Sequence, residues 1–329
     1  MTSLVGSSGM ATRLYRVGAI RRLDRWLHTT PQPSVVVEIA DDHVAAARQG
    51  SGHGKLDAFA VEPLPTGSVM ASPLETNVTQ PDTVRSALRR VFQSVPAHSE
   101  SIALLVPDAV VRVFILPFDL LPRKAEDALP LLRWRLKKSV PFDMEETVVS
   151  WMRQNGREGN LEVVTAVARR QILREYEEIV ESLAARPDMV VSSTLATLPL
   201  LEESGATLLA RFCGKTLTSA IVQGPNLCVY RSTDMAGGPA HLDPRAFLDE
   251  VFPVVAYYQD TWGSSIDRAR LAGFGSRQEL FREALAQDLK IAVDPLAESQ
   301  SALELEGPAR DLVHRGLDSL AGWMMNGDA

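Results

Sequence analysis

One short stretch of the chain imitates a phosphate-binding sequence, Gly214-Lys215-Thr216. In a P-loop, a glycine-rich turn holds phosphates through its backbone N–H groups, and the lysine and hydroxyl residue that follow begin a helix. The first glycine of that motif falls here at Leu209, and the residues after Thr216 predict a strand where a helix is needed. The sequence therefore excludes a P-loop at this position.

The other residue types that carry chemistry form no catalytic or metal-binding pattern. The histidines are scattered, with no pair at the helical spacing of metal ligands: His28, His43, His53, His98, His241 and His314. No Ser/His/Asp group follows from spacing, and the adjacent Glu126 and Asp127 point apart on a helix, which favours solvated charge. Cys213 and Cys228 are too few for a disulfide framework, so we expect reduced thiols. We predict neither a metal site nor a catalytic residue.

Composition and charge narrow the class of protein. A chain of 329 residues that is 45% hydrophobic and 23% charged can bury a large core, and two lobes are the natural expectation. The net charge is -7, and because residues 1–30 hold a local balance of +4, the remainder carries -11, which argues against nucleic-acid binding. No apolar run approaches the roughly 18 residues of a membrane span, and the start lacks the pattern of a secretory signal. We therefore expect a cytosolic protein.

The first 33 residues form a basic N-terminal tail and linker. Residues 11–28 can form an amphipathic helix that sets Trp26 and apolar side chains opposite Arg21, Arg22 and Arg25. A basic helix with a tryptophan suits an anionic membrane surface. A solvated tail explains the segment equally well, because residues 29–33 have the composition of a linker. Both interpretations stay open.

The segment that follows has the alternation of an α/β lobe. A β-branched run at 35–49, a flexible turn at 50–55 and a strand at 56–61 predict a hairpin. Val84, Leu88 and Val91 then mark a helix, and Ile102 to Val106 predicts a buried strand. Strands alternating with a helix in this way predict α/β character for this part of the chain.

Residues 110–151 read as a strand that leads into a charged amphipathic helix. Ala125, Leu129, Leu132 and Leu136 form one apolar stripe, which can pack on a sheet while the basic residues remain exposed. Pro130 removes a backbone donor within this helix, so we expect a kink or two shorter helices. The pattern predicts a docking unit, although an ordinary core strand and helix account for it as well.

The remaining pattern supplies further strands and helices. Strands at 148–153 and 161–168 and a helix at 170–185 complete the central unit. A second α/β lobe then follows, with strands at 190–193, 207–212, 217–222, 227–233, 268–273 and 291–293, and helices at about 194–203, 244–262, 277–288 and 309–325.

The motif order within the central unit resembles a known family. Ile115-Leu116-Pro117, a helix carrying Trp134, Val140-Pro141-Phe142 and an acidic residue before a strand resemble the small inserted subdomain of the type IV pilus assembly protein PilM. The likeness extends over about residues 34–322. It implies a two-lobed actin-like (ribonuclease H-like) α/β ATPase fold related to FtsA, with an inserted α+β subdomain. The domains it implies are a tail at 1–33, a first lobe at 34–108, the insertion at 109–189 and a second lobe at 190–329.

The resemblance implies a nucleotide cleft, but the residues at its first phosphate-binding hairpin are altered. The family pattern D-I-G-S-S-S-I-K falls on residues 38–45, which begin with Glu38. Ala40 places a Cβ where a glycine lets the backbone approach phosphate. Asp41 and Asp42 add two negative charges there, and Ala45 replaces the lysine. Together these changes argue against tight ATP binding.

The residues of the second hairpin and the adenosine loop also argue against tight ATP binding. The family pattern V-D-I-G-A-T-T-T falls on residues 210–217, where Arg211 replaces the aspartate and Cys213 a glycine. Arg211 or Lys215 could still attract a phosphate, and the adenosine loop keeps only the weak signal of two glycines before a helix. The degenerate cleft that the resemblance implies is made of Glu38, Asp41, Asp42, Arg211, Gly214, Lys215, Gly273 and Gly275. We predict a pseudo-ATPase without a cofactor, ATP with magnesium being disfavoured.

The function that the resemblance implies is a non-catalytic scaffold of type IV pilus assembly at the cytoplasmic face of the inner membrane. A PilN-type membrane protein would insert its N-terminal tail into a groove between the insertion and the first lobe. The candidate groove residues are Val106, Leu116, Trp134, Pro141 and Phe142, for which core packing is an equally good interpretation. Two alternatives stay open: an active ATPase, and a scaffold of type II secretion similar to GspL.

Overall fold

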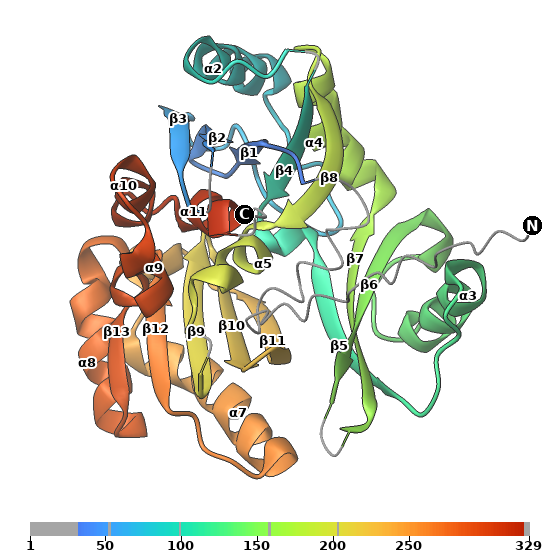
Figure 1. The fold of residues 1–329 in the computed structure, drawn as a ribbon, viewed down its shortest axis with the longest axis vertical. Helices are drawn as coiled ribbons and strands as arrows, with labels where there is room; N and C mark the ends of the chain where they lie inside the picture. Colours follow the sequence, from blue (N-terminus) through green and yellow to red (C-terminus); the bar gives the residue numbers. More distant parts are fainter. Residues whose placement is uncertain (1–31, 52–53, 99, 157–158, 203, 326–329) are drawn as a thin grey trace, which may run out of the picture.

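The computed structural model describes residues 32–51, 54–98, 100–156, 159–202 and 204–325. Three β-sheets and the helices around them make up this part of the chain (Figure 1). The predicted amphipathic helix at 11–28 lies outside the described residues. Among the helices that are described, none is both long and apolar enough to cross a membrane.

The first sheet has the order β3-β2-β1-β4-β8 and is the centre of the upper lobe in Figure 1. Its strands are β1 (Val35–Ile39), β2 (His43–Gln49), β3 (Leu56–Pro63), β4 (Ser101–Val106) and β8 (Arg186–Ser192). The first three form an antiparallel meander, while β4 and β8 run parallel to β1. Helices α2 (Pro81–Ser94) and α4 (Arg170–Glu181) share an apolar core with this sheet. Strand β8 spans the predicted domain limit at residue 189.

The second sheet repeats this plan with the order β11-β10-β9-β12-β13. It consists of β9 (Ala206–Cys213), β10 (Thr216–Gln223), β11 (Asn226–Asp234), β12 (Arg268–Ala272) and β13 (Ala292–Pro295). An antiparallel meander is again extended by two parallel strands. Helices α6 (Gly238–His241), α7 (Pro244–Trp262) and α8 (Gln278–Leu289) accompany it. Phe274, from the loop after β12, packs at ring-centroid distances of 5.0 to 5.4 Å from Phe212, Phe247 and Phe281, joining sheet and helices.

Short helices lie between the two sheets: α5 (Ser193–Thr197), α9 (Gln300–Glu304), α10 (Pro308–His314) and α11 (Asp318–Met325) (Figure 1). The single helix predicted for 309–325 is wrong, because the chain turns at Gly316 with φ 78°. Helix α11 then packs closely on α5, where a Cβ at Gly322 would overlap the carbonyl oxygen of Ala196. Trp323 is fully buried there. The 3₁₀ turns are η2 (Asp108–Val110), η3 (Met144–Glu146), η5 (Leu198–Leu200), η6 (Gly275–Arg277) and η7 (Leu296–Glu298).

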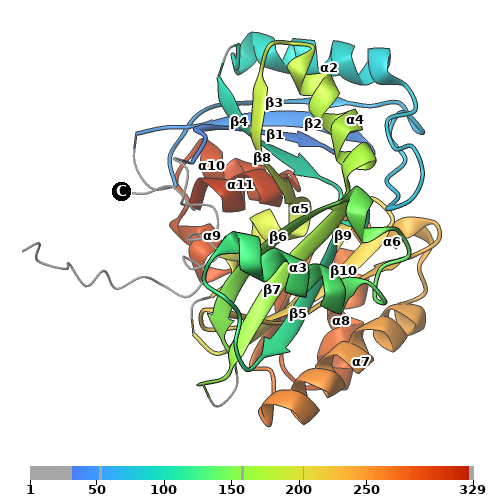
Figure 2. The same ribbon diagram turned by 90° about the vertical axis from the view of Figure 1, so that its right-hand side faces the viewer.

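The third sheet is antiparallel with the order β5-β7-β6 and belongs to the insertion. Its strands are β5 (Arg112–Phe118), β6 (Thr147–Asn155) and β7 (Leu161–Arg169), and α3 (Ala125–Leu136) packs on one face (Figure 2). Along β7, Val163 and Val167 point to α3, whereas Val164 packs in the core between the lobes, as strand alternation requires. One continuous helix runs through Pro130, so the alternative of two shorter helices is wrong.

A side chain of the insertion ties it to the second lobe. The amide Nε2 of Gln154, on β6, donates to the backbone oxygen of Leu227 at 2.8 Å. The backbone N–H of Leu227 donates to Oε1 of Gln154 at 3.1 Å. Gln154 thus satisfies both backbone groups of Leu227 near the start of β11, as a neighbouring strand would.

Candidate functional site between the lobes

The turns of two hairpins meet where the lobes face each other. The β1–β2 turn carries Asp41 and Asp42, and the β9–β10 turn carries Gly214 and Lys215. A Cβ added at Gly214, whose φ is 59°, would overlap the Asp41 carboxylate. The two turns are therefore in direct contact.

Arg211 occupies the centre of this region and is only 4% exposed. Its Nε donates to Oδ2 of Asp318 at 2.6 Å, while Nη1 and Nη2 each donate at 3.2 Å to the hydroxyls of Thr194 and Ser193. Nη1 also lies 3.7 Å from Oδ2 of Asp108. Burial by itself would lower the pKa of Arg211, but the charge of Asp318 and other nearby acidic groups hold it above its ordinary value. The guanidinium is therefore a permanent buried cation.

Buried hydroxyl and backbone groups hold the two carboxylates that face Arg211. Asp108 accepts from the Thr194 N–H at 2.8 Å and from the Thr218 hydroxyl at 3.0 Å, and also from the Thr194 hydroxyl. Asp318 accepts from the Thr197 hydroxyl at 2.9 Å. Because Asp108 follows β4, Thr194 lies in α5 and Thr218 in β10, this network spans both lobes.

Glu38 and His43 form a second charged group beside the first. Glu38 is 3% exposed and accepts from the hydroxyls of Ser193 and Ser319, the latter at 2.7 Å. His43 Nδ1 lies 2.6 Å from Oδ1 of Asp42, and its Nε2 lies 3.6 Å from Oε2 of Glu38. Burial would raise the pKa of Glu38, yet His43 and Arg211 lower it to about 2. Burial would likewise lower the pKa of His43, but Asp42 and Glu38 raise it to about 10, so imidazolium faces carboxylate at neutral pH.

Asp41 differs from these residues because it lacks a strong cation partner. Burial and the charge of Asp42 raise the pKa of Asp41 to about 6, and the attraction of Lys215 offsets this only in part. Its Oδ1 atom is buried without a hydrogen-bond partner. Lys215 itself is exposed.

The two glycines of the predicted adenosine loop serve close packing and a turn. Gly273 has φ 77°, and a Cβ there would overlap the backbone oxygen of Phe212. Gly275 has φ 56° and open space around it. Arg277, which follows, donates through Nη1 to the carbonyl oxygens of Pro239 and Leu242, both at 2.8 Å, and to that of Ala240 at 3.0 Å. This loop is therefore fastened to α6.

The residues present are a poor fit to ATP. Glu38, Asp41 and Asp42 repel phosphate from the first hairpin, and the buried charge of Arg211 is already paired. The two turns also contact each other directly, at Gly214 and Asp41. No group of three or more His, Cys, Asp or Glu residues among those described has the arrangement of a metal site.

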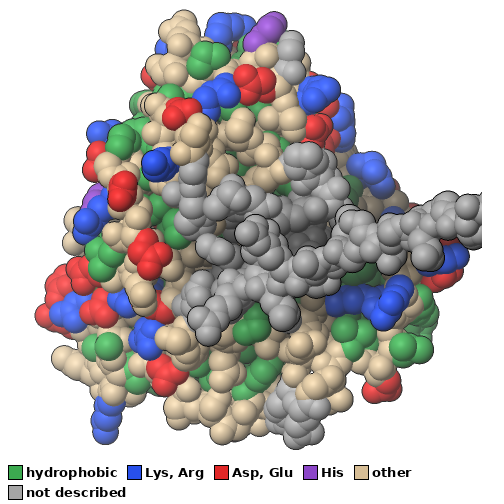
Figure 3. Space-filling model, viewed as in Figure 1, with side chains coloured by type: hydrophobic (Ala, Val, Ile, Leu, Met, Phe, Trp, Pro, Cys, Tyr) green, Lys and Arg blue, Asp and Glu red, His purple; other side chains and the backbone are tan. Residues whose placement is uncertain are grey.

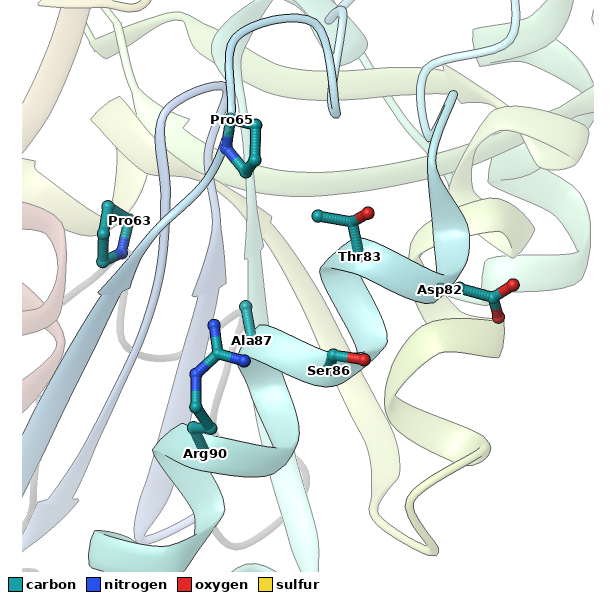
Figure 4. Close-up of a pocket in the computed structure, with 7 residues that line it drawn as sticks. All are labelled: Pro63, Pro65, Asp82, Thr83, Ser86, Ala87 and Arg90. Atoms are coloured by element: carbon teal, nitrogen blue, oxygen red, sulfur yellow. The ribbon is translucent and has the colours of Figure 1, made fainter.

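A separate hollow of about 440 Å³ lies on the first lobe (Figure 4). It lies between α2 and the segment after β3, and is lined by Pro63, Pro65, Asp82, Thr83, Ser86, Ala87 and Arg90. Arg90 is paired through Nε with Glu62 at 2.7 Å. This hollow includes none of the predicted site residues.

Sequence reasoning missed Asp108, Asp318 and the hydroxyl residues of α5. A signal existed for two of these positions, because Asp108 and Thr194 come just after β4 and β8, and the carboxyl ends of parallel strands meet at one edge. Asp318 begins a short helix far along the chain, and its local sequence carries no signal of that contact.

The five predicted partner-binding residues do not share one surface. Val106 is fully buried in the core of the first sheet. Leu116 and Phe142 are half-buried and pack against the same cluster beneath α3. Pro141 is exposed, and Trp134, on the outside of α3, is 75% exposed. Their role in binding stays a prediction.

The chain is similar to proteins of type IV pilus assembly in both sequence and fold. Residues 38–197 match the family model of the type IV pilus assembly protein PilM. The chain is similar to a solved PilM-PilN type IV pilus biogenesis complex, with TM-score 0.70, 17% identity, and coverage of 91% of this chain and 100% of that one. No curated protein sequence matches the chain.

Two further solved structures are less similar to the chain in fold. One is the cytoplasmic domain of EpsL, of the type II secretion system of Vibrio cholerae, with TM-score 0.46, 12% identity, and coverage of 72% and 80% of the two chains. The other is a Bacteroides thetaiotaomicron protein with an actin-like ATPase fold, with TM-score 0.47, 13% identity, and coverage of 88% and 97%. The predicted resemblance to the PilM family and the predicted actin-like α/β fold are both confirmed.

Proposed function

We propose that this PilM-like chain is a non-catalytic scaffold of type IV pilus assembly. In this role it binds the cytoplasmic N-terminal tail of a PilN-type protein at the cytoplasmic face of the inner membrane. The similarity to the PilM-PilN complex over 91% of the chain supports the partner. The absence of a catalytic role is supported by a single observation, the buried Arg211 paired with Asp318 and Asp108 between the lobes.

The pairing of Arg211 with Asp318 and Asp108 disfavours nucleotide binding, because the arginine is not free to neutralise phosphate. A triphosphate that recruits Arg211 must first separate it from Asp318, and two carboxylates would then remain buried without a cation. Breaking a buried ion pair in this way typically costs several kcal/mol. ATP with magnesium would therefore gain little from this arginine, and the exposed Lys215 is the one lysine of the two turns.

Thermal unfolding with and without millimolar ATP and magnesium tests this part of the proposal. A ligand at about 100 times its dissociation constant stabilises a protein by about 2.7 kcal/mol, so useful binding would be visible. We expect an unchanged melting temperature. A saturable upward shift that is lost in Lys215→Ala would instead favour an active nucleotide site.

Titration with a PilN-type tail peptide tests the partner. Phe142 is half-buried and, like Leu116, packs against a buried cluster under α3, next to the exposed Pro141. If its ring contacts the tail, Phe142→Ala should weaken binding by about 2 kcal/mol or more, the scale of an aromatic hot spot. Phe252→Ala is the matched control, since this ring is 38% exposed on α7, a helix of the second lobe.

Circular dichroism melting on the same samples separates binding from folding. A loss of roughly 3 to 5 kcal/mol of stability would assign Phe142 to the core, because that is the usual cost of truncating a buried phenylalanine. A folded Phe142→Ala variant with the parent's affinity would remove this residue from the partner site.

A further inference from the structure

The outer surface of the insertion exposes large apolar side chains around α3. Trp134 is 75% exposed and Leu131 42% exposed on the helix, and Leu120, in the segment just before it, is 82% exposed. Figure 2 shows α3 in front of the β5-β7-β6 sheet. Exposed apolar patches that are rimmed by polar residues mark contact surfaces for proteins or membranes.

The packing of α3 fixes these side chains outward. Ala128, Leu132 and Leu136 are buried against the sheet. Because residues three and four apart share a helix face, Pro130 and Trp134 lie on the opposite side. Turning Trp134 inward would expose the buried stripe, so the exposed ring is a stable feature of this fold.

Basic residues accompany the apolar anchors at both ends of the helix. Arg123 and Lys124 follow Leu120 closely, and Arg135, Lys137 and Lys138 surround Trp134 in sequence, all of them exposed. From residue 119 to 138 there are six basic residues, Arg123, Lys124, Arg133, Arg135, Lys137 and Lys138, and three acidic ones, Asp119, Glu126 and Asp127. This local excess of positive charge stands out in a chain of net charge -7.

Helix α7, in the second lobe, also exposes aromatic rings, but acidic residues lie beside them. Its Tyr257 is 57% exposed and its Phe252 38% exposed. The exposed charged residues beside them include Asp249 and Asp260. Both helices thus expose large apolar side chains, but α3 is basic in its second half and α7 is acidic near its exposed rings.

We propose that the outer face of α3 docks on anionic lipid headgroups at a membrane surface. Trp134 and Leu131 enter the interface between headgroups and acyl chains, while Lys137 and Lys138 contact phosphate or carboxylate headgroups. Arg135 is held elsewhere, because its guanidinium lies over the Phe118 ring at 5.4 Å from the centroid. The surface of a helix is convex, and a lipid interface can conform to it. This inference stands apart from the proposed partner, because it concerns lipid binding by the chain alone.

Sedimentation of the full chain with vesicles tests this inference, with phosphatidylglycerol mixed into phosphatidylcholine and with phosphatidylcholine alone. We expect binding to the anionic vesicles that weakens with salt. Each lysine near such a surface contributes about fivefold to affinity, so Lys137→Glu/Lys138→Glu should weaken binding by at least about tenfold. Trp134→Ala should weaken binding several-fold, whereas Tyr257→Ala should leave it unchanged. Residues 1–30 are the same in all variants, so they cannot produce a difference among them.

Other outcomes would overturn the proposal. Equal vesicle binding by the parent and both α3 variants would show that lipid contact lies elsewhere. Unfolding by a variant would be seen in its melting curve, and the conservative Trp134→Phe, which keeps a ring, should then retain most of the binding. A dimer seen by light scattering, lost in Trp134→Ala and accompanied by no vesicle binding, would assign this face to a second copy of the chain.

Discussion

The two hairpins that meet between the lobes have the same backbone plan and opposite charge. The first presents Glu38, Asp41 and Asp42, and the second presents Arg211 and Lys215. In a nucleotide clasp both hairpins would serve one anionic ligand. Here Arg211, from the second hairpin, meets carboxylates inside the protein, while Glu38, from the first, lies beside a charged histidine. The backbone plan of the two hairpins is therefore compatible with charged side chains that are paired inside the protein.

The hairpins also differ in how firmly their charges are held. Arg211 is fixed by four polar groups and excluded from water, whereas Asp41 is only partly buried and has a carboxylate oxygen without a partner. Replacing Arg211 should therefore cost more stability than replacing Asp41.

The largest effect is expected from Arg211→Met. It removes the cation from between Asp108 and Asp318 and leaves two buried carboxylates facing each other. Losing one partner of a buried pair typically costs about 3 to 5 kcal/mol, measured as the free energy of unfolding in urea. Asp318→Asn in the same chain should restore part of this loss.

Arg231→Met is the matched control for that measurement. Arg231 pairs with Glu250 at 3.0 Å, but its side chain is 48% exposed. Such pairs contribute about 0 to 1 kcal/mol. Equal losses in the free energy of unfolding for Arg211→Met and Arg231→Met would contradict the expectation that the buried arginine contributes more than the exposed one.

A smaller effect, dependent on pH, is expected from His43→Gln. The folded-state pKa of about 10 exceeds the ordinary 6.5, so the charged imidazole stabilises the fold fully below pH 6.5 and this contribution is lost as the pH rises toward 10. The variant should be about 2 kcal/mol less stable than the parent at pH 6, since part of the shift is screened at the exposed Asp42. Unfolding titrations at several pH values should find the two curves converging near pH 10. A constant difference would refute the charged state.

The smallest effect should have the opposite sign, in Asp41→Asn. The folded-state pKa of Asp41, about 6, lies above its ordinary 3.8, so the parent loses stability as the pH rises from 3.8 to 6. At pH 7.5 the variant should therefore be more stable by about 1 kcal/mol, since water screens part of the shift at the half-buried Asp41, and this gain should shrink below pH 6. A variant that is less stable at pH 7.5 would mean that the Asp41 charge supports the hairpin contact.

The sequence predicted many strands and helices because these leave local patterns, although the run at 35–49 forms two strands, β1 and β2. The helix at 244–262 matches α7, and the strands at 207–212 and 217–222 lie within β9 and β10. Non-local contacts left no such pattern. Arg211 was identified as a replacement for an acidic residue, but its partner Asp318 lies 107 positions away, and nothing local links the two. The break at Gly316 was missed because apolar residues on both sides keep a helical spacing.

The pair of hydrogen bonds between Gln154 and Leu227 has a mechanical consequence. A force that pulls the insertion away from the second lobe must break both bonds at once, because they join the same amide to the same residue. Tension applied to the insertion is thereby shared with the β11-β10-β9 strands, and so with a sheet far larger than its own. Together with Met152 and Val164, which pack in the same core as Leu227, this side chain resists separation of the insertion from the second lobe.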